Sequence, residues 1–417
     1  MNGRRRFLLA SAGLACSPAL AQQRTRLKFW AMGREGEVVR ELLRDFERDN
    51  PDIRLDIQGL PWTAAHEKLL TAFAGDAVPD LCQLGNTWIP EFAALDALEP
   101  LDRQVAAAAI PREDYFEGIW ETNVIDGRLL GVPWYVDTRL LFYRRDILAG
   151  AGFDSPPRDW SEWVRMSEAI KARNPKEFAV ILPLNEYEPL VALSLQQAEP
   201  LLRDGGRYGN FRGEGFRRAL DFYLGMFRQG LAPPANDTQI ANVWNEFAKG
   251  HFTFYISGPW QIGEFKRRLP ASLQDAWMTA PLPGPAGPGH SIAGGCSLAI
   301  FRRSRAKDAA WRVVEYLSRP QAQRRFHEMT GNLPPRRSSW SGVLEGDAYA
   351  RAFREQLDRV KPAPKVPEWE RIAQEMRLVT ERVVRGDFPA AEAPAELDRR
   401  ADRMLEKRRW MLARAKA

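Results

Sequence analysis

GRLLGVPWYVDTRLLFYRRDILAGAGFDSPPRDWSEW, residues 127–163, is the stretch from which the fold is predicted most directly. A Gly-Arg turn leads into an extended aromatic-rich segment, which is followed by a short helix pattern, a Pro-Pro break and a new helix start. Asp137 stands beside Trp134 and Tyr135. Flat aromatic faces next to a carboxylate are typical of sites that bind carbohydrate.

The size and composition of the chain indicate a globular protein of about two domains. The chain has 417 residues, 45% of them apolar, and its charges are mixed in sign. A chain of this length can bury more than one large core.

The N-terminus predicts a signal peptide over residues 1–21. Three arginines (residues 4–6) precede a short apolar run, and Ala19-Leu20-Ala21 is an A-x-A cleavage signal ahead of Gln22. We therefore expect a periplasmic protein. The Arg-Arg-Arg-Phe-Leu-Leu motif also fits twin-arginine export, so Sec and Tat export both stay open.

The charge balance argues against nucleic acid as a partner. Without the three arginines of the signal peptide, the formal charge of +6 falls to about +3, and the remaining basic runs are interrupted by acids. Cys82 and Cys296 remain after cleavage, each in an apolar run. They could pair in an oxidising compartment, but we expect two buried free thiols.

Alternating strand and helix patterns predict βαβ units around a parallel sheet. Residues 26–30 form a predicted strand, 36–48 an amphipathic helix, 53–57 a second strand, 66–73 a helix and 80–84 a third strand. Ligands of such sheets lie beyond the carboxyl ends of the strands. Aromatic and amide side chains stand at three of these ends: Trp30, Gln58, Trp62, Asn86, Thr87 and Trp88.

Two later segments have distinctive turn chemistry. PLPGPAGPG, residues 281–289, predicts an irregular surface loop. The strand predicted at residues 292–301 contains Gly294-Gly295, which would let a ligand or another backbone approach closely.

The ordered set of segments resembles extracellular solute-binding proteins of the maltose-binding type, which serve ABC importers. The resemblance rests on RLKFW, FERDNPDIRLDIQ, TAFAGDAVPDL, the residue 127–163 stretch, FAKGHFTFYISGPWQI, AGGCSLAIFRRSRAKDAAWRVVEYL and GNLPPR, and it spans nearly all of the mature chain. No single segment is specific; the order is.

The resemblance implies a two-lobed α/β fold of the periplasmic-binding-protein type II, each lobe a mixed sheet flanked by helices and joined by hinge crossings. We expect an N-lobe from residues 22–134 and 292–335, and a C-lobe from residues 135–291 and 336–417. The crossings are expected near Trp134–Val136, Ser291–Gly294 and Asn332–Arg337. The implied partners are a sugar and the permease and ATPase of an importer, with the chain itself a monomer that closes around its ligand.

The resemblance and the strand-end positions together give the candidate ligand-binding residues. They are Trp30, Glu35, Gln58, Trp62, Asn86, Thr87, Trp88, Trp134, Tyr135, Asp137, Glu186, Trp260, Gly294, Gly295 and Arg336. Asp137 could instead serve only as a salt-bridge partner of Arg139. Met32 and Arg34 depart from the best-known maltose binder, and the SGPW and GVPWYVD segments favour a disaccharide of the maltose or trehalose type.

Other function classes have weaker support. The HEKLL segment at His66 lacks the second histidine of a zinc-protease helix, and no G-x-S-x-G or phosphate-loop pattern is present, so we expect no catalytic residues, metal or cofactor. A glycosidase using Asp137 and Glu186 stays open as a minor alternative. Glycerol phosphate or a polyamine are the rival ligands, and an adhesive surface protein is the remaining class.

Overall fold

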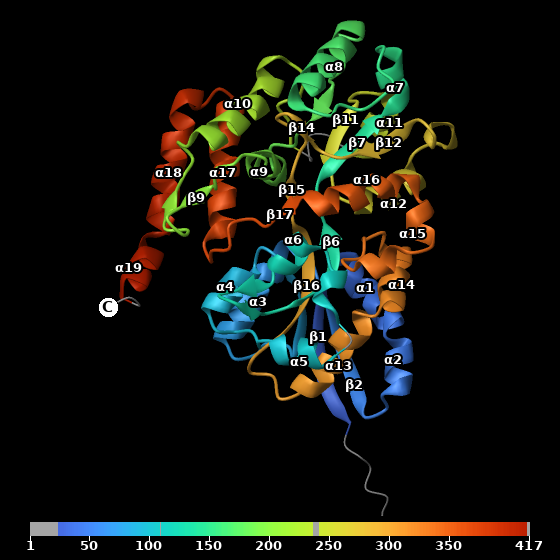
Figure 1. Cartoon of the computed structure of the whole chain (residues 1–417), viewed down its shortest axis with the longest axis vertical. Coiled ribbons are helices and arrows are strands. Elements are labelled where there is room, and N and C mark those ends of the chain that lie inside the picture. The colour runs from blue at the N-terminus through green and yellow to red at the C-terminus, as the bar shows by residue number, and fades with distance from the viewer. Residues whose placement is uncertain (1–23, 109, 237–241, 415–417) are drawn as a thin grey trace, which may run out of the picture.

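The chain forms two lobes, each built on a β-sheet covered by helices (Figure 1). The computed structural model describes residues 24–108, 110–236 and 242–414, so the predicted signal peptide lies outside the described part. We call the lobe on the five-stranded sheet the N-lobe and the lobe on the four-stranded sheet the C-lobe. The predicted α/β class and two-lobed architecture are confirmed.

The N-lobe sheet is mixed, as predicted. Strand β1 pairs in parallel with β2 and β3, whereas β16 runs antiparallel to both β3 and β6. Each of its two faces is buried under helices, which accounts for the almost continuous apolar runs of its central strands. The sheet order is β2 (Ile53–Leu60), β1 (Thr25–Met32), β3 (Leu81–Gly85), β16 (Gly294–Ile300) and β6 (Val132–Asp137).

Helices cover the two faces of this sheet in separate groups. One face packs on α1 (Gly33–Leu42), α2 (Arg44–Asp49), α5 (Asp102–Ala107), α6 (Glu117–Glu121), α13 (Lys307–Leu317) and α14 (Pro320–Thr330). The other face packs on α3 (Trp62–Ala74) and α4 (Ile89–Ala94). A short hairpin joins β4 (Val124–Ile125) to β5 (Arg128–Leu129). The helix predicted over residues 36–48 is interrupted at Leu43, whose ψ of 5° leaves the helical range.

The C-lobe sheet has the order β12 (Trp277–Ala280), β7 (Leu140–Arg144), β11 (Phe254–Ser257) and β8 (Val180–Ile181). One core contains α7 (Arg145–Gly150), α8 (Trp160–Arg173), α9 (Glu188–Leu195), α10 (Glu214–Arg228), α17 (Trp369–Val384) and α18 (Ala393–Met404). The other contains α11 (Val243–Lys249), α12 (Trp260–Arg268), α15 (Val343–Gly346) and α16 (Ala348–Gln356). A β9 (Leu202–Arg203) and β10 (Tyr208–Gly209) hairpin and α19 (Glu406–Arg414) complete the lobe.

The prediction of irregular structure at residues 281–289 was wrong. Strand β13 (Pro283–Gly284) pairs antiparallel with β14 (Gly287–Pro288) around a two-residue turn. The glycines make this possible, because a Cβ on Gly284 would stand 2.8 Å from the carbonyl oxygen of Gly287.

Within the described residues, the chain passes between the lobes three times. Strand β6 ends at Asp137 in the N-lobe sheet and β7 begins at Leu140 in the C-lobe sheet, so the first passage follows the expected segment Trp134–Val136 rather than lying within it. The return runs through β15 (Ser291–Ile292), which pairs with β17 (Val360–Lys361) and leads into β16. The last passage follows Leu333, which bridges to Val136 of β6.

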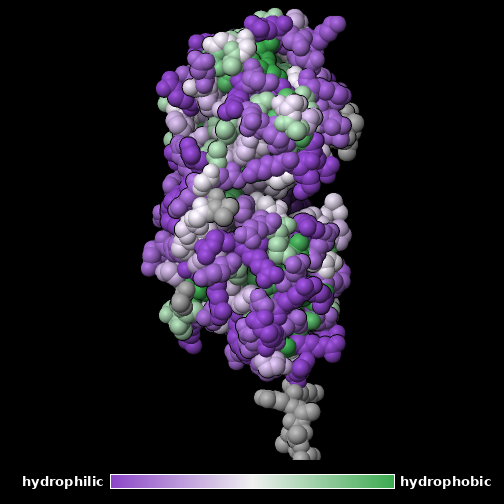
Figure 2. All heavy atoms as spheres, turned by 90° about the vertical axis from the view of Figure 1, so that its right-hand side faces the viewer, coloured by the Kyte–Doolittle hydropathy of each residue, from purple (hydrophilic) through white to green (hydrophobic). Residues whose placement is uncertain are grey.

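The outer surface seen in Figure 2 is mostly hydrophilic, with hydrophobic side chains in small separate areas. In the part of the chain that the structure describes, no helix combines the length and apolarity needed to cross a bilayer. Cys82 and Cys296 are both buried and unbonded, which confirms the prediction of free thiols.

Candidate ligand-binding site

Glu35 is a buried acid in the first turn of α1, where the N-lobe sheet meets the C-lobe. It is only 7% exposed and accepts a hydrogen bond of 2.6 Å from the amide of Asn332. Burial raises the pKa of Glu35 despite this hydrogen bond and the nearby indole N–H of Trp62, and the negative charge of Asp137 adds to the rise. The two carboxyl groups are therefore close enough for the charge of Asp137 to affect Glu35.

An aromatic group stands beside Glu35 on the N-lobe. Trp62, the first residue of α3, is 40% exposed, and its ring centroid lies 5.9 Å from that of Trp88. His66 lies 4.9 Å from Trp88 and shares a 2.7 Å hydrogen bond with Glu91. Burial acts to lower the pKa of His66, but its hydrogen bond to Glu91 and the nearby acids raise it overall.

Asp137 ends strand β6, at the first passage between the lobes. Its side chain is 31% exposed, and its Oδ1 lies 3.8 Å from Nε of Arg139. Burial raises the pKa of Asp137, the positive charge of Arg139 opposes the rise, and Glu188 adds to it. The separation exceeds hydrogen-bond length, so the two groups interact through charge.

Arg139 connects this acid to the C-lobe. Its Nη2 donates a 3.2 Å hydrogen bond to Glu188, and its guanidinium lies 4.8 Å from the ring centroid of Trp260. Burial acts to lower the pKa of Arg139, but the charges of Asp137 and Glu188 raise it overall. Arg139 is therefore a permanent cation among acids.

Tyr187 and Glu370 extend the C-lobe side of the site. The Tyr187 hydroxyl donates to Glu370 at 3.2 Å. Burial raises the pKa of Glu370, while polar interactions with Thr87 and Tyr187 and the charge of His66 lower it. Because Thr87 and His66 belong to the N-lobe, Glu370 joins the two lobes.

These residues are linked in turn by contacts or by the action of their charges in a set that spans both lobes, which we call the interlobe ring. In order around it, the members are Glu35, Trp62, Trp88, His66, Glu370, Tyr187, Glu188, Arg139 and Asp137, with Thr87 and Trp260 packed against it. The ring combines aromatic faces with hydrogen-bond acceptors, and it contains one buried cation.

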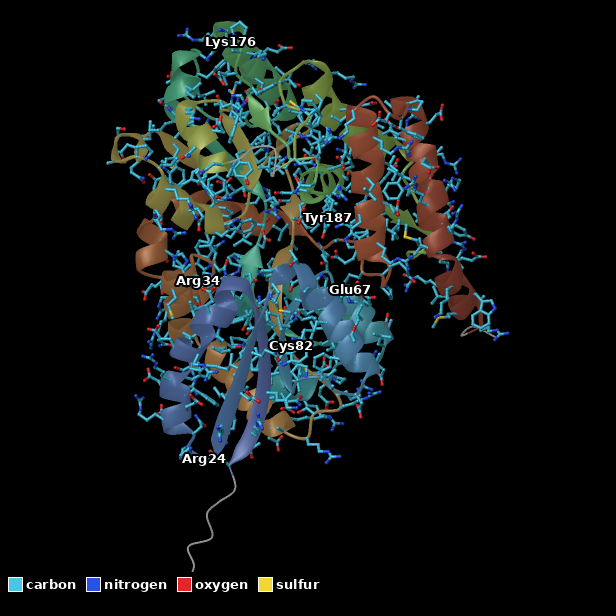
Figure 3. The ribbon with its side chains drawn as sticks, turned by 180° about the vertical axis from the view of Figure 1, so that it is seen from behind. Arg24, Arg34, Glu67, Cys82, Lys176 and Tyr187 are labelled. Carbon is cyan, nitrogen blue, oxygen red and sulfur yellow. The ribbon has the colours of Figure 1, made fainter. Side chains whose placement is uncertain are left out.

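An open cavity of about 830 Å³ adjoins the ring between the lobes. His66 and Glu370 belong to both, and the rest of the lining comes from α3, α4, α17, α18 and Pro367. Figure 3 shows Tyr187 at the edge of the C-lobe. Across from it on the N-lobe is Glu67, which lines the cavity. The volume falls within the range of small-molecule sites.

The structure places seven predicted residues in the ring or against it: Glu35, Trp62, Thr87, Trp88, Asp137, Trp260 and, beside Arg139, Glu186. The negative charge of Glu186 acts on both Arg139 and Tyr223. Glu186 lines a small recess of about 10 Å³ with Tyr187 and Tyr223, so it lies behind the ring on the α17 side.

Three predicted strand-end residues lie away from the ring. Trp30 packs on the α3 face of the sheet with Lys68 5.1 Å over its ring, and Gln58 is exposed on the edge strand β2. Asn86 is buried, with its Oδ1 accepting from Ser297 at 2.9 Å. All three belong to the N-lobe, and none of them is a member of the interlobe ring.

Trp134 and Tyr135 are buried in the N-lobe core. Trp134 is 1% exposed and stacks on Phe326 at 4.5 Å, so both its faces are covered by protein. The Tyr135 hydroxyl accepts from Gln83 at 3.0 Å and donates to Cys296 at 3.2 Å. Neither ring is available to a ligand in this structure.

Gly294 and Gly295 serve the pairing of β16 with β6. A Cβ on Gly294 would stand 2.3 Å from the carbonyl oxygen of Asp137, and one on Gly295, whose φ is 126°, 2.2 Å from that of Tyr135. The close approach that the glycines allow is thus between two backbones.

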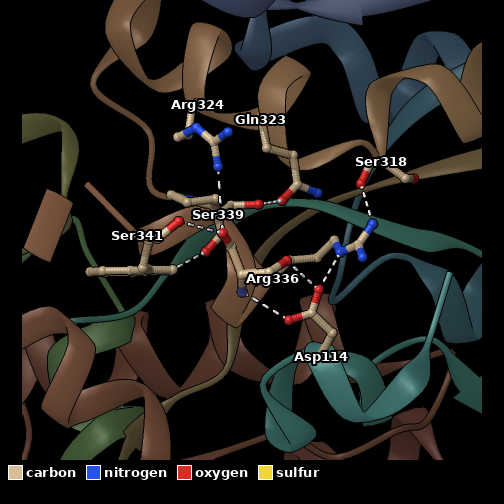
Figure 4. Close-up of polar contacts among 10 residues, drawn as sticks. Asp114, Ser318, Gln323, Arg324, Arg336, Ser339 and Ser341 are labelled. Carbon is tan, nitrogen blue, oxygen red and sulfur yellow. Dashed lines mark hydrogen bonds and ion pairs between the residues drawn. The ribbon is translucent and has the colours of Figure 1, made fainter. Parts of the chain in front are cut away.

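Arg336 also lies away from the ring, at the last passage between the lobes. It donates to Asp114 at 2.6 Å and to the Ser318 carbonyl oxygen at 2.7 Å (Figure 4). Burial acts to raise the pKa of Asp114, but hydrogen bonds from Ser338 and Arg336 to its carboxylate lower that pKa overall. The buried Arg336–Asp114 pair holds the last passage between the lobes in place, and neither residue lines the cavity.

Sequence reasoning missed several members of the ring. Arg139 was considered only as a partner of Asp137, and His66 only as part of an incomplete metal motif. Tyr187 and Glu188 follow the predicted Glu186 directly, and this grouping of acids and an aromatic was the signal available. Glu370 had no local signal, because its neighbours in the ring come from distant parts of the chain.

Comparison with known proteins gives a consistent family. Residues 32–324 match the model of the bacterial extracellular solute-binding proteins. The structure of the sugar-binding protein MalE from Xanthomonas citri is 57% identical, covers 93% of this chain and 99% of its own, and superposes with a TM-score of 0.90.

More distant relatives show the same overall correspondence. The diacetylchitobiose-binding protein DasA of Streptomyces coelicolor is 25% identical over 85% of this chain and 83% of its own length. The mannitol-binding protein of Pseudomonas aeruginosa is 25% identical over 87% and 85%, respectively. These relatives are binding proteins and not enzymes. Among the described residues, no group of three or more His, Cys, Asp or Glu is placed to hold a metal ion.

Proposed function

The chain belongs to the bacterial extracellular solute-binding proteins, and from this we propose that it binds a sugar between its lobes and delivers it to an ABC importer in the inner membrane. The ligand we propose is a disaccharide or short oligosaccharide of the maltose or trehalose type. The 57% identity to a sugar-binding MalE supports this ligand class. The predicted export signal supports a periplasmic location.

The interlobe ring is the observation that carries the proposal. A sugar offers apolar C–H faces and hydroxyl edges. Trp62 in the ring and Trp260, which packs against it, offer aromatic surfaces for the faces. The carboxylates of the ring, among them Asp137 and Glu35, can accept hydrogen bonds from hydroxyls, and such charge-assisted bonds are stronger than neutral ones.

The placement of the ring supports ligand-driven closure. Asp137 and Trp62 belong to the N-lobe, whereas Trp260 and Glu188 belong to the C-lobe. A ligand that contacts both sets binds the closed state more tightly than the open state, and therefore shifts the population toward closure. The importer's permease would then distinguish the loaded protein by its closed shape.

A thermal-shift panel tests the ligand class. The panel contains trehalose, maltose, glucose, glycerol 3-phosphate and spermidine, each added to the mature chain. We expect trehalose or maltose to raise the unfolding temperature in a concentration-dependent manner, because a ligand that binds only the folded state stabilises it. A shift with spermidine or glycerol phosphate and none with any sugar would reject the proposal.

A further inference from the structure

Arg139 occupies the passage from β6 to β7 and contacts four segments that are far apart in the sequence. Its side chain is 7% exposed. It faces Asp137 of β6, Glu188 of α9 and Trp260 of α12. Its backbone carbonyl accepts a 2.6 Å hydrogen bond from Ser291, on the strand by which the chain returns to the N-lobe.

We propose that Arg139 is the positioning residue of the sugar site, holding the carboxylate of Asp137 and the ring of Trp260 in a fixed relation across the passage between the lobes. The inference rests on the proposed function, because it assigns a role to a residue behind the proposed ligand contacts. Arg139 acts through these two neighbours and not by touching the sugar.

The geometry at Asp137 indicates that the charge of Arg139 holds the Asp137 carboxylate in place. Asp137 Oδ1 and Arg139 Nε are both buried, and neither has a hydrogen-bond partner among the described residues. Since the Asp137 side chain is nevertheless 31% exposed, its exposure comes from atoms other than Oδ1. One oxygen is thus held by the charge of Arg139, and the other is left for a ligand hydroxyl.

The contact with Trp260 suits a planar cation. The guanidinium lies over the indole ring while Nη2 donates to Glu188, and a guanidinium can stack and donate in its plane at the same time. A lysine would keep the charge but lose the flat surface and the fork of donors. The two functions of Arg139, charge and stacking, can therefore be separated by substitution.

The charge of Arg139 matters because Asp137 is surrounded mainly by other acids and neutral groups. The titratable groups that act on Asp137 or its partner Arg139 are Glu35 on α1, Glu186 before α9, Glu188 on α9, Tyr255 on β11, Tyr135 on β6 and Cys296 on β16. Burial already raises the pKa of Asp137, and Arg139 opposes this rise. Removing the cation should raise that pKa further, so the loss of sugar binding on acidification should begin at a higher pH.

The experiment compares Arg139→Met and Arg139→Lys with Arg144→Met as a matched control. Arg144 ends the same strand that Arg139 precedes, is also 7% exposed at its side chain, pairs with Asp146 and lies 5.9 Å from the ring of Phe247. It lies outside the interlobe ring. Affinity for trehalose and maltose is measured by titration calorimetry from pH 4.5 to 8, and folding is followed by circular dichroism and thermal unfolding.

We expect Arg139→Met to weaken sugar binding by about 10- to 100-fold, because Asp137 and Trp260 lose the group that fixes their positions and small misplacements of contact groups are costly. We also expect it to shift the loss of affinity on acidification to higher pH. Arg139→Lys should lose affinity on acidification over the same pH range as the wild type, but it should bind the sugar more weakly at every pH. Arg144→Met should keep the wild-type affinity and its pH dependence, even if it lowers the unfolding temperature.

Three results would overturn the proposal. They are a wild-type pH dependence of affinity in Arg139→Met, a shift of that dependence to higher pH in Arg144→Met, or loss of folding in both Arg139 variants, which would make Arg139 a core residue. Failure of the wild-type chain to bind any sugar would instead reject the proposed function, so the two failures are distinguishable.

Discussion

Replacing Asp137 by asparagine tests whether the carboxylate at the first passage serves a ligand or only the fold. The substitution keeps the shape of the side chain and removes its charge. Asp137 lies 3.8 Å from Arg139 without a hydrogen bond, and Arg139 keeps its 3.2 Å hydrogen bond to Glu188 in the variant. Because burial raises the pKa of Asp137, its ionised form does not stabilise the fold at neutral pH, so removing the charge should not lower the free energy of unfolding.

The expected effect on binding is larger than the effect on stability. Hydrogen bonds to a charged group are worth about 1.5–3 kcal/mol, which corresponds to about a 10- to 150-fold loss of affinity for the sugar. The pH dependence has a definite sign. Because the pKa of Asp137 is raised, its ionised form, and the advantage of the wild type over Asp137→Asn, should disappear as the pH falls through that pKa.

The same shift has the opposite sign for stability without sugar. A carboxyl whose pKa is raised in the folded state stabilises the fold in its protonated form, and this contribution is lost as the pH rises through the folded pKa. Asp137→Asn should therefore be no less stable than the wild type at neutral pH.

Titration calorimetry with trehalose and maltose, and chemical denaturation without sugar, measure the two effects. Asp146→Asn is the control, because Asp146 also pairs with a buried arginine, Arg144, but lies outside the interlobe ring. Unchanged affinity in Asp137→Asn, or a loss of several kcal/mol in its free energy of unfolding, would refute the reasoning and assign Asp137 to a structural ion pair.

Three further substitutions separate the ring from the core. Trp62→Ala should weaken sugar binding, measured by calorimetry, while changing the unfolding temperature little, because Trp62 is 40% exposed; equal affinity would exclude it from the site. Trp134→Ala should lower the free energy of unfolding by about 3–5 kcal/mol, measured in urea, because it removes the stack on Phe326; a mild loss would contradict its core role. Arg336→Met should cost about 3–5 kcal/mol by leaving Asp114 buried without its cation. That cost should shrink as the pH falls through the lowered pKa of Asp114, and a pH-independent cost would contradict the ion-pair account.

Much of the fold could be predicted from local patterns. The alternation of strands and helices in the N-lobe follows from periodicity, and α10 shows the clearest case, with Phe216, Leu220, Tyr223 and Leu224 on its buried face. The boundaries were less predictable. The break at Leu43 depends on one backbone angle, and the hairpin at residues 283–288 depends on the close backbone approach at Gly284; apolar spacing determines neither.

The candidate site was predictable where a residue's position along its own strand or helix determines its role. Asp137 at the end of β6 and Trp62 at the start of α3 are of this kind. The environment of Trp134 was not, because Phe326, which covers it, lies almost 200 residues away in the sequence. Glu370 was missed for the same reason, since Thr87, Tyr187 and His66 reach it only after the lobes come together.

A crystal structure of the mature chain with trehalose or maltose would test the central claim most directly. We predict a single sugar between the lobes, with a hydroxyl on the Asp137 carboxylate and a pyranose face against Trp62 or Trp260. A sugar bound elsewhere, or lobes that hold no saccharide at concentrations that saturate related binding proteins, would contradict it.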